Sequence, residues 1–269
     1  NDPDDDLPWF EGAGDDVLLR LQGIRFHVAA GRRIDIDAPL ETPSADTRVW
    51  LLGSVMAALL HQRGFLPVHA NVIALADGKA AAFAGDSGAG KSTLAAWFET
   101  RGQRVLADDL CAIRLDEAGI PRLFEGIPRV KLWSDALDAF GRAREGLEKV
   151  ASDIDKYHVP LARSAEPGSL DPLTLERIYL LERATDGEDF GIFRMAGAEA
   201  ANAVLVNAFR WELGQLIQPH RAQFDHCLAL ARHANVFRVR RRWGFDSFDT
   251  DCQAIEAHLQ APLAGLDVQ

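Results

Sequence analysis

The stretch VHANVIALADGKAAAFAGDSGAGKSTLAAWFETRG, residues 68–102, decides the fold. Its first part contains two apolar runs, 68–75 and 79–84, on either side of a short turn, and this pattern predicts a β-hairpin. Its last part, 92–102, carries apolar residues at helical spacing and predicts a helix of about three turns. A hairpin directly before a glycine-rich loop predicts a mixed sheet, because the strand before such a loop otherwise lies among parallel strands.

The glycine-rich loop fits the pattern G-x-x-x-x-G-K-[ST] through Gly85, Gly90, Lys91 and Ser92. In such a loop the backbone N–H groups form a cradle for an anion, and the dipole of the following helix adds to it. The lysine reaches the β and γ phosphates of a nucleotide, and the serine hydroxyl binds Mg²⁺. The predicted nucleotide contacts are Gly85, Asp86, Ser87, Gly88, Ala89, Gly90, Lys91, Ser92 and Thr93. The alternative is a loop of this sequence that no longer binds nucleotide.

A pair of aspartates, Asp108 and Asp109, follows the short apolar segment VLA about 16 residues after Lys91. Adjacent residues at the end of a strand point to opposite faces, so the two carboxylates can diverge. One of them can then reach the magnesium ion of the loop while the other reaches a substrate hydroxyl. The alternative is that both aspartates cap a turn, where Asp is favoured.

The composition narrows the partners. The chain has 269 residues, with 40 acidic and 29 basic side chains and a formal net charge of -11, which argues against nucleic acid or an anionic membrane as partner. Its three cysteines form no CxxC pair, so a reduced cytoplasmic location is expected. No apolar run is long enough to cross a membrane. The sequence does not begin with Met, so we expect that the natural N-terminus is missing.

The rest of the chain predicts two parts. Residues 1–65 combine three short alternating segments with a helical pattern and predict a small N-terminal α+β module, which leaves 66–269 as the catalytic domain. The charged stretch 145–172, interrupted by Pro and Gly, predicts a mobile loop. The run RVRRRW, 238–243, is interpreted as an edge strand kept soluble by its charge.

The hairpin, the loop and the aspartate pair together resemble the catalytic domain of HPr kinase/phosphorylase, in which a histidine-bearing strand, a phosphate loop and an Asp-Asp strand follow in the same order. The resemblance covers about 50 residues closely. It implies an α/β fold with the phosphate loop in a mixed sheet of the HPr kinase and phosphoenolpyruvate carboxykinase type. It also implies ATP and Mg²⁺ as cofactors.

The resemblance assigns roles to single residues. Lys91 would contact the phosphates, Ser92 and Asp109 would hold Mg²⁺, and Asp108 would accept the proton of a serine hydroxyl. His69 would lie near Asp108 and orient it, whereas without the resemblance a lone histidine in an apolar strand is read as structural. Independently of the resemblance, the basic residues Arg129, Lys131 and Lys156 are candidates for phosphate or substrate contacts, and ordinary surface cations are the alternative.

Two departures from the family's sequence pattern indicate a different substrate. EGIPRVKLW, 125–133, stands where the family has its partner-recognition segment, and Thr93 stands where an acidic residue is usual. The passages RVWLLGSVMAALLHQRGFLPVHA and IPRVKLW instead resemble the HPr-kinase-like enzymes associated with lasso peptides. This similarity implies a kinase acting on a peptide serine, the C-terminal serine of a lasso precursor, with HPr-type regulation of carbon use, a P-loop ATPase and a nucleotide-binding regulatory module as alternatives. HPr kinases assemble as homo-oligomers, and the changed segment leaves that property open.

Overall fold

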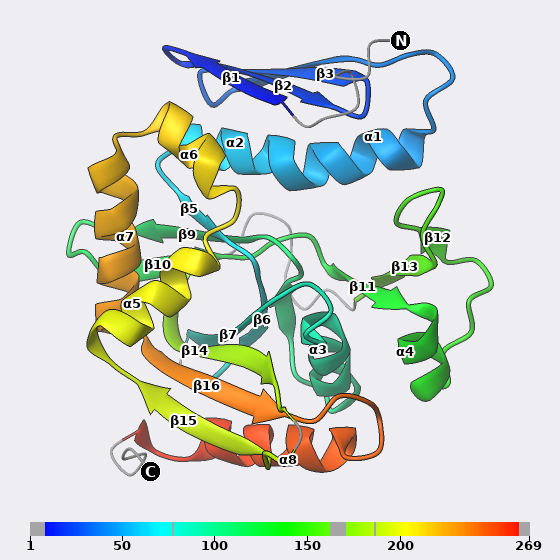
Figure 1. Cartoon of the computed structure of the whole chain (residues 1–269), viewed down its shortest axis with the longest axis vertical. Helices are drawn as coiled ribbons and strands as arrows, with labels where there is room; N and C mark the ends of the chain where they lie inside the picture. Colours follow the sequence, from blue (N-terminus) through cyan, green and yellow to red (C-terminus); the bar gives the residue numbers. More distant parts are fainter. Residues whose placement is uncertain (1–8, 77, 162–170, 186, 264–269) are drawn as a thin grey trace.

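The computed structural model describes residues 9–76, 78–161, 171–185 and 187–263. Among these residues, nine strands form a central mixed sheet (Figure 1). The strands are β5 (Leu66–Val68), β6 (Ala70–Ala74), β7 (Lys79–Ala84), β8 (Val105–Ala107), β9 (Cys111–Leu115), β10 (Pro121–Phe124), β14 (Leu173–Arg183), β15 (Gly191–Met195) and β16 (Asn235–Arg241). β7 pairs with β6 antiparallel and with β14 parallel, so the predicted hairpin and the predicted mixed sheet are both confirmed.

Helices cover both faces of this sheet. Successive side chains of β7 point to opposite faces, and because both sets are apolar, each face needs a helix layer to bury it. Ala80, Ala82 and Ala84 face one core, which includes residues of α5 (Gly197–Val206) and α7 (His220–His233). Ala81 and Phe83 face the other core, beneath α3 (Lys91–Thr100) and α8 (Phe248–Gln260). The small alanines on both faces of β7 let the helices approach closely, and the strand that leads into the glycine-rich loop is buried on both sides.

The N-terminal residues form a separate four-stranded antiparallel sheet, at the top of Figure 1. It consists of β1 (Trp9–Ala13), β2 (Asp16–Leu21), β3 (Ile24–Ala29) and β4 (Arg33–Asp37). A continuous helical segment follows, made of α1 (Ser44–Trp50), one π-helical turn (Leu51–Val55) and α2 (Met56–Gln62). The sheet and this helical segment pack around an apolar core, and Leu213 of α6 (Trp211–Ile217) belongs to it. A segment from the second half of the chain therefore completes the N-terminal part.

The region from 145 to 172 is more ordered than the sequence predicts. β12 (Glu148–Lys149) and β13 (Lys156–Pro160) pair with each other, and β13 also pairs with β11 (Arg129–Trp133). The expectation of a loop is therefore wrong for these strands, because their polar residues pair with a partner remote in sequence; 162–170 lie outside the described residues. The small sheet and α4 (Ser134–Ala139) lie to the right of the central sheet in Figure 1.

The arginine-rich strand β16 is not at an edge. It lies between β14 and β15, and its arginines Arg238 and Arg240 pair with acidic side chains of neighbouring elements. Arg238 pairs with Glu182 and Glu199, and Arg240 pairs with Glu188. The interpretation of this run as an edge strand is therefore wrong, since acidic residues on neighbouring elements allow the charged strand to lie inside the sheet.

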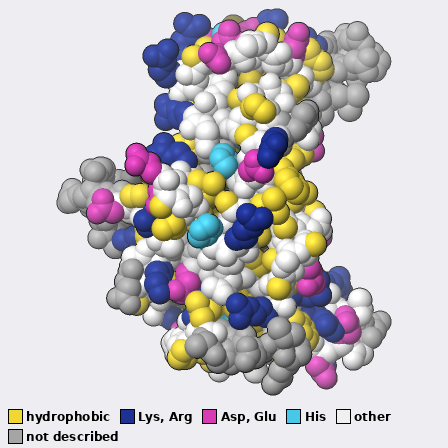
Figure 2. Space-filling model, turned by 90° about the vertical axis from the view of Figure 1, so that its left-hand side faces the viewer, with side chains coloured by type: hydrophobic (Ala, Val, Ile, Leu, Met, Phe, Trp, Pro, Cys, Tyr) yellow, Lys and Arg dark blue, Asp and Glu magenta, His cyan; other side chains and the backbone are white. Residues whose placement is uncertain are grey.

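The surface carries mixed charge. Figure 2 shows the face with α5, α6 and α7, where basic and acidic side chains alternate with apolar ones and no broad basic area is present. Of the helices in the described ranges, none has the length and apolar character needed to cross a bilayer.

Candidate active site

The glycine-rich loop makes a tight turn between β7 and α3 that only glycine permits at two positions. Gly85 has φ +139°, and a Cβ there would lie 2.6 Å from the carbonyl oxygen of Leu181. Gly90 has φ +80°, and a Cβ there would lie 2.0 Å from the Nη2 atom of Arg241. The loop therefore packs directly against the neighbouring strands β14 and β16.

Lys91 begins helix α3 and folds back across the loop. Its Nζ atom donates hydrogen bonds to the carbonyl oxygens of Gly85, at 2.8 Å, and Asp86, at 3.0 Å. The side chain is only 5% exposed, and burial lowers the pKa of its ammonium group. The ammonium is thus held at the centre of the loop, where a phosphate group would replace the carbonyl oxygens as its partner.

Asp108 follows strand β8 and is held by three hydrogen bonds. Its Oδ1 atom accepts from Asn71 Nδ2 at 2.6 Å and from Ser92 Oγ at 2.9 Å, and its Oδ2 atom accepts from the backbone N–H of Lys131 at 2.8 Å. Burial, and next the negative charge of Asp109, raise the pKa of Asp108 to about 6. The carboxylate therefore has a fixed position and an affinity for protons close to neutral pH.

Asp109 has a different environment from Asp108. Its backbone has φ +65°, an uncommon conformation for a residue with a side chain. Burial by itself would raise the pKa of Asp109, but Lys131 and Lys156 outweigh burial and lower the pKa to about 2. The Nζ atom of Lys131 lies 2.8 Å from Asp109 Oδ2. The two adjacent carboxylates thus differ in their partners and in their affinity for protons.

His69 occupies the break between β5 and β6. Its Nδ1 atom lies 3.0 Å from the carbonyl oxygen of Asp109, and its ring stacks on Phe209 with centroids 5.6 Å apart. Burial, and next the charge of Lys91, lower the pKa of His69. A neutral ring that donates from Nδ1 to a carbonyl presents Nε2 as an acceptor. The sequence places His69 beside Asp108, whereas its hydrogen bond in the structure goes to the main chain of Asp109.

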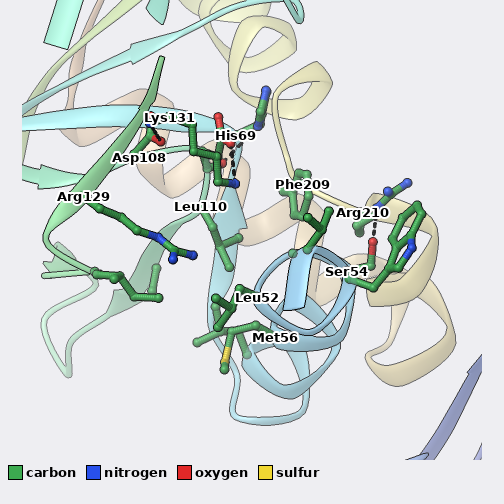
Figure 3. Close-up of a pocket in the computed structure, with 18 of the residues that line it drawn as sticks. Leu52, Ser54, Met56, His69, Asp108, Leu110, Arg129, Lys131, Phe209 and Arg210 are labelled. Carbon is green, nitrogen blue, oxygen red and sulfur yellow. Dashed lines mark hydrogen bonds and ion pairs between the residues drawn. The ribbon is translucent and has the colours of Figure 1, made fainter. Parts of the chain in front are cut away.

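Two cavities border this group of side chains. The first, here called the helix-side cavity, has a volume of about 520 Å³ and lies between the N-terminal helical segment and the aspartates (Figure 3). His69, Asp108 and Lys131 are at its polar end, and Leu52 and Met56 line its apolar end. Asp109 also lines this cavity. The second, here called the loop-side cavity, has a volume of about 390 Å³ and includes Lys91, Ser92 and Thr93. Lys131 lines both cavities, so its side chain lies where they approach each other.

The three predicted cations all lie near the aspartates. Arg129 points into the helix-side cavity from β11 (Figure 3) and forms no ion pair with a carboxylate within the described ranges. Lys131 pairs with Asp109, as described above. Lys156 lies opposite Trp133 in the pairing of β11 and β13, with its Nζ 5.8 Å from the Trp133 ring, and its charge acts on both aspartates.

Sequence reasoning missed the two asparagines that hold this site together. Asn71, fully buried in β6, positions Asp108. Asn207, at the end of α5, accepts two hydrogen bonds. Its side-chain oxygen accepts from the backbone N–H of Gly85, and its backbone carbonyl oxygen accepts from the backbone N–H of His69. A buried amide is costly unless it is hydrogen-bonded, so the Asn in the apolar run VHANVIAL was a usable signal for Asn71. Asn207 carries no comparable local signal, because the two groups it holds at the site, those of Gly85 and His69, are remote from it in sequence.

The donor atoms fit a magnesium nucleotide. Ser92 offers a hydroxyl and the aspartates offer carboxylates, which are the hard oxygen donors that Mg²⁺ prefers in combination with phosphate oxygens and water. The carboxylate in direct contact with Ser92 is that of Asp108, at 2.9 Å, and not that of Asp109. The sequence-based pairing of Ser92 with Asp109 is therefore not reproduced as a direct contact.

Comparisons with known proteins add little. No family model matches the chain, and no curated protein matches it. A solved structure that does match is the HPr(Ser) kinase/phosphatase from Coxiella burnetii, at 11% sequence identity and a TM-score of 0.34, with 72% of this chain and 97% of that chain covered. This similarity is too distant to assign a fold or an activity, so both rest on the geometry of the chain itself.

Proposed function

We propose that the protein is an ATP- and Mg²⁺-dependent kinase that transfers the γ-phosphoryl group to a serine hydroxyl of a peptide. The observation that carries this proposal is that Lys131 lines two cavities, one on the glycine-rich loop and the other lined by the aspartates and His69. Phosphoryl transfer requires a nucleotide and an acceptor on opposite sides of a charged centre, and catalysis consists mostly of positioning and charge neutralisation.

In this proposal the loop and Lys91 bind the nucleotide phosphates, and Ser92 and Asp109 hold Mg²⁺. When bound, Mg²⁺ supplies positive charge that offsets the charge of the phosphates. Asp108 accepts the acceptor proton, because it borders the helix-side cavity and its pKa, raised to about 6, suits a base at neutral pH. Lys131 lies between both sites and neutralises charge on the group in transfer.

The helix-side cavity is proposed as the acceptor site. Its apolar end suits an apolar side chain next to the serine, and Arg129 and Arg210 offer guanidinium groups to a carboxylate. Arg210 donates to Ser54 Oγ at 2.9 Å and lies 5.4 Å from the Phe209 ring. A C-terminal serine would bring a hydroxyl and a carboxylate together, which supports a peptide such as a lasso precursor over a folded HPr-type protein.

The experiment compares Asp108→Asn, Asp109→Asn and the exposed control Asp37→Asn. We expect Asp108→Asn to abolish transfer from ATP to peptide while ATP binding in Mg²⁺ stays within about threefold of the parent. Asp109→Asn is expected to remove the strengthening of ATP binding by Mg²⁺, measured by calorimetry with and without the cation. Normal turnover in Asp108→Asn contradicts the base assignment. If Asp108→Asn loses the Mg²⁺ effect and Asp109→Asn keeps it, the two assignments are reversed. Asp108 would then hold Mg²⁺ together with Ser92, which it contacts, and Asp109 would be the base.

A further inference from the structure

The loop-side cavity has a wall of exposed aromatic side chains that the proposed chemistry does not use. Trp133, Trp243 and Phe245 line it and are 48%, 53% and 44% exposed. Large aromatic rings left in contact with solvent side by side mark a binding surface more often than isolated ones do. These three come from two separate segments, the end of β11 and the connection between β16 and α8.

The exposed aromatic rings pack against neighbouring side chains and lie next to the glycine-rich loop. Phe248, which is buried, packs against Phe245 with ring centroids 5.7 Å apart. The guanidinium of Arg183 lies 5.6 Å from the centre of the Trp243 ring. A Cβ at Gly88 would lie 3.8 Å from the same ring, so Trp243 is adjacent to the turn of the loop. A ligand whose phosphates occupied the loop would therefore have these rings within the same cavity.

A buried arginine in the same cavity points to an anionic ligand. Arg241 is 6% exposed, and its Nη2 atom donates to the carbonyl oxygen of Ala89 at 2.7 Å. Its Nε atom is buried without a hydrogen-bond partner, and within the described ranges Arg241 forms no ion pair. The charge of Asp251 acts on Arg241 without a direct ion pair between them. A buried cation that lacks a direct partner is costly, and an anion bound at the loop would provide one.

We infer that the loop-side cavity binds the purine base of the nucleotide by stacking on Trp243 and Trp133, with Arg241 behind the loop as a cation for the phosphates. This inference rests on the proposed function, because it takes nucleotide phosphates at the loop as given. Stacking is selective for ring area and tolerant of base identity, since every base has a π face. ATP and GTP are therefore expected to bind with similar affinity, and CTP more weakly.

The test measures ATP, CTP and inorganic tripolyphosphate binding by calorimetry in Mg²⁺. Trp243→Ala is expected to weaken ATP binding by about 10-fold to 100-fold and to leave tripolyphosphate binding within about threefold, because only ATP carries a base. Trp243→Phe keeps an aromatic ring and is expected to retain most of the ATP affinity. Trp9→Ala, which removes a half-exposed tryptophan from β1, is the control and should bind all three ligands as the parent does.

The outcomes separate the two claims. If the parent binds tripolyphosphate as tightly as ATP, or if Trp243→Ala leaves ATP affinity unchanged, the base site is wrong and the kinase proposal stands. If the parent binds neither ATP nor tripolyphosphate, both are wrong. Equal weakening of both ligands in Trp243→Ala also overturns the base site, because the ring would then act on the loop itself. Retained ATP binding in Trp243→Phe together with its loss in Trp243→Ala supports the inference.

Discussion

Gly90 is the residue at which the glycine-rich loop, helix α3 and strand β16 come together. Gly119 has nearly the same left-handed backbone conformation, since its φ is +77° and that of Gly90 is +80°. A Cβ at Gly119 would meet no atom within 4 Å, whereas one at Gly90 would collide with the guanidinium of Arg241. The pair therefore separates backbone strain from crowding at the site.

We predict that Gly90→Ala weakens ATP binding by about 10-fold or more, because Arg241 must move away from the loop. Gly119→Ala carries the same backbone cost and is expected to lower thermal stability by a few degrees while binding ATP normally. Calorimetry and thermal unfolding of both variants provide the measurement. Equal ATP affinity in the two variants would show that the contact between Gly90 and Arg241 is irrelevant to binding.

The raised pKa of Asp108 predicts an acid limit to activity. In its proposed role as the base, Asp108 must be deprotonated, so kcat/KM for the peptide is expected to fall about tenfold per pH unit below about pH 6. The effect on stability has the opposite sign. Because the folded-state pKa lies above the ordinary value of 3.8, Asp108 favours folding at low pH and loses that contribution as the pH rises to about 6. A profile of kcat/KM between about pH 5 and pH 8 tests the assignment, and a flat profile in that range argues against Asp108 as the base.

For single residues, the sequence predicted which side chains lie together in the site. It predicted their individual hydrogen-bond partners less well. The loop pattern and the Asp-Asp pair follow from local geometry, since a turn before a helix and alternation at a strand end involve only neighbouring residues. The partners of Asp108 come from β6, α3 and β11, and those of His69 are Asp109, after β8, and Asn207, directly after α5. No local rule relates such distant segments.

The element that fixes the loop in place is strand β7, through the ring of Phe83. This ring stacks on Phe98 of α3 and on Tyr179 of β14, with centroids 5.5 Å apart in each case. The Tyr179 ring in turn stacks on Phe237 of β16 at 5.3 Å. A continuous column of rings therefore joins the strand before the loop, the helix after it and the two strands behind it.

We predict that Phe83→Ala lowers the free energy of unfolding by about 3–5 kcal/mol, the usual cost of deleting a fully buried ring. Phe224→Ala, on the exposed face of α7, is expected to change it by less than about 0.5 kcal/mol. Urea denaturation of both variants measures the difference. Similar values for the two would mean that the column of rings does not stabilise the sheet.

Element prediction succeeded where periodicity is regular and failed where pairing is remote. The hairpin of β6 and β7 and the helix α3 were predictable from alternation and helical spacing. The run 68–75, by contrast, is divided at His69, because β5 pairs with β9 while β6 pairs with β7 and β8. The strands within 145–172 were missed because their short, charged sequence acquires strand structure only through β11.

For the molecule as a whole, the N-terminal residues complete the proposed acceptor site. Their helical segment provides the apolar end of the helix-side cavity, while α6 fills the N-terminal core from the opposite end of the chain. The division into parts at residues 65 and 66 stays a prediction. The cavity itself could not be predicted, because its lining residues come from segments remote in sequence, such as Leu52, Asp108 and Arg210, and come together only through tertiary packing.

Transfer of labelled phosphate tests the central claim most directly. The protein would be incubated with γ-labelled ATP, Mg²⁺ and a synthetic peptide that ends in serine after an apolar residue, with the same peptide ending in alanine as control. The account predicts label on the serine hydroxyl, none on the alanine peptide, and none with Asp108→Asn. Label found only in free phosphate, with no peptide labelled, would show an ATPase and contradict the account.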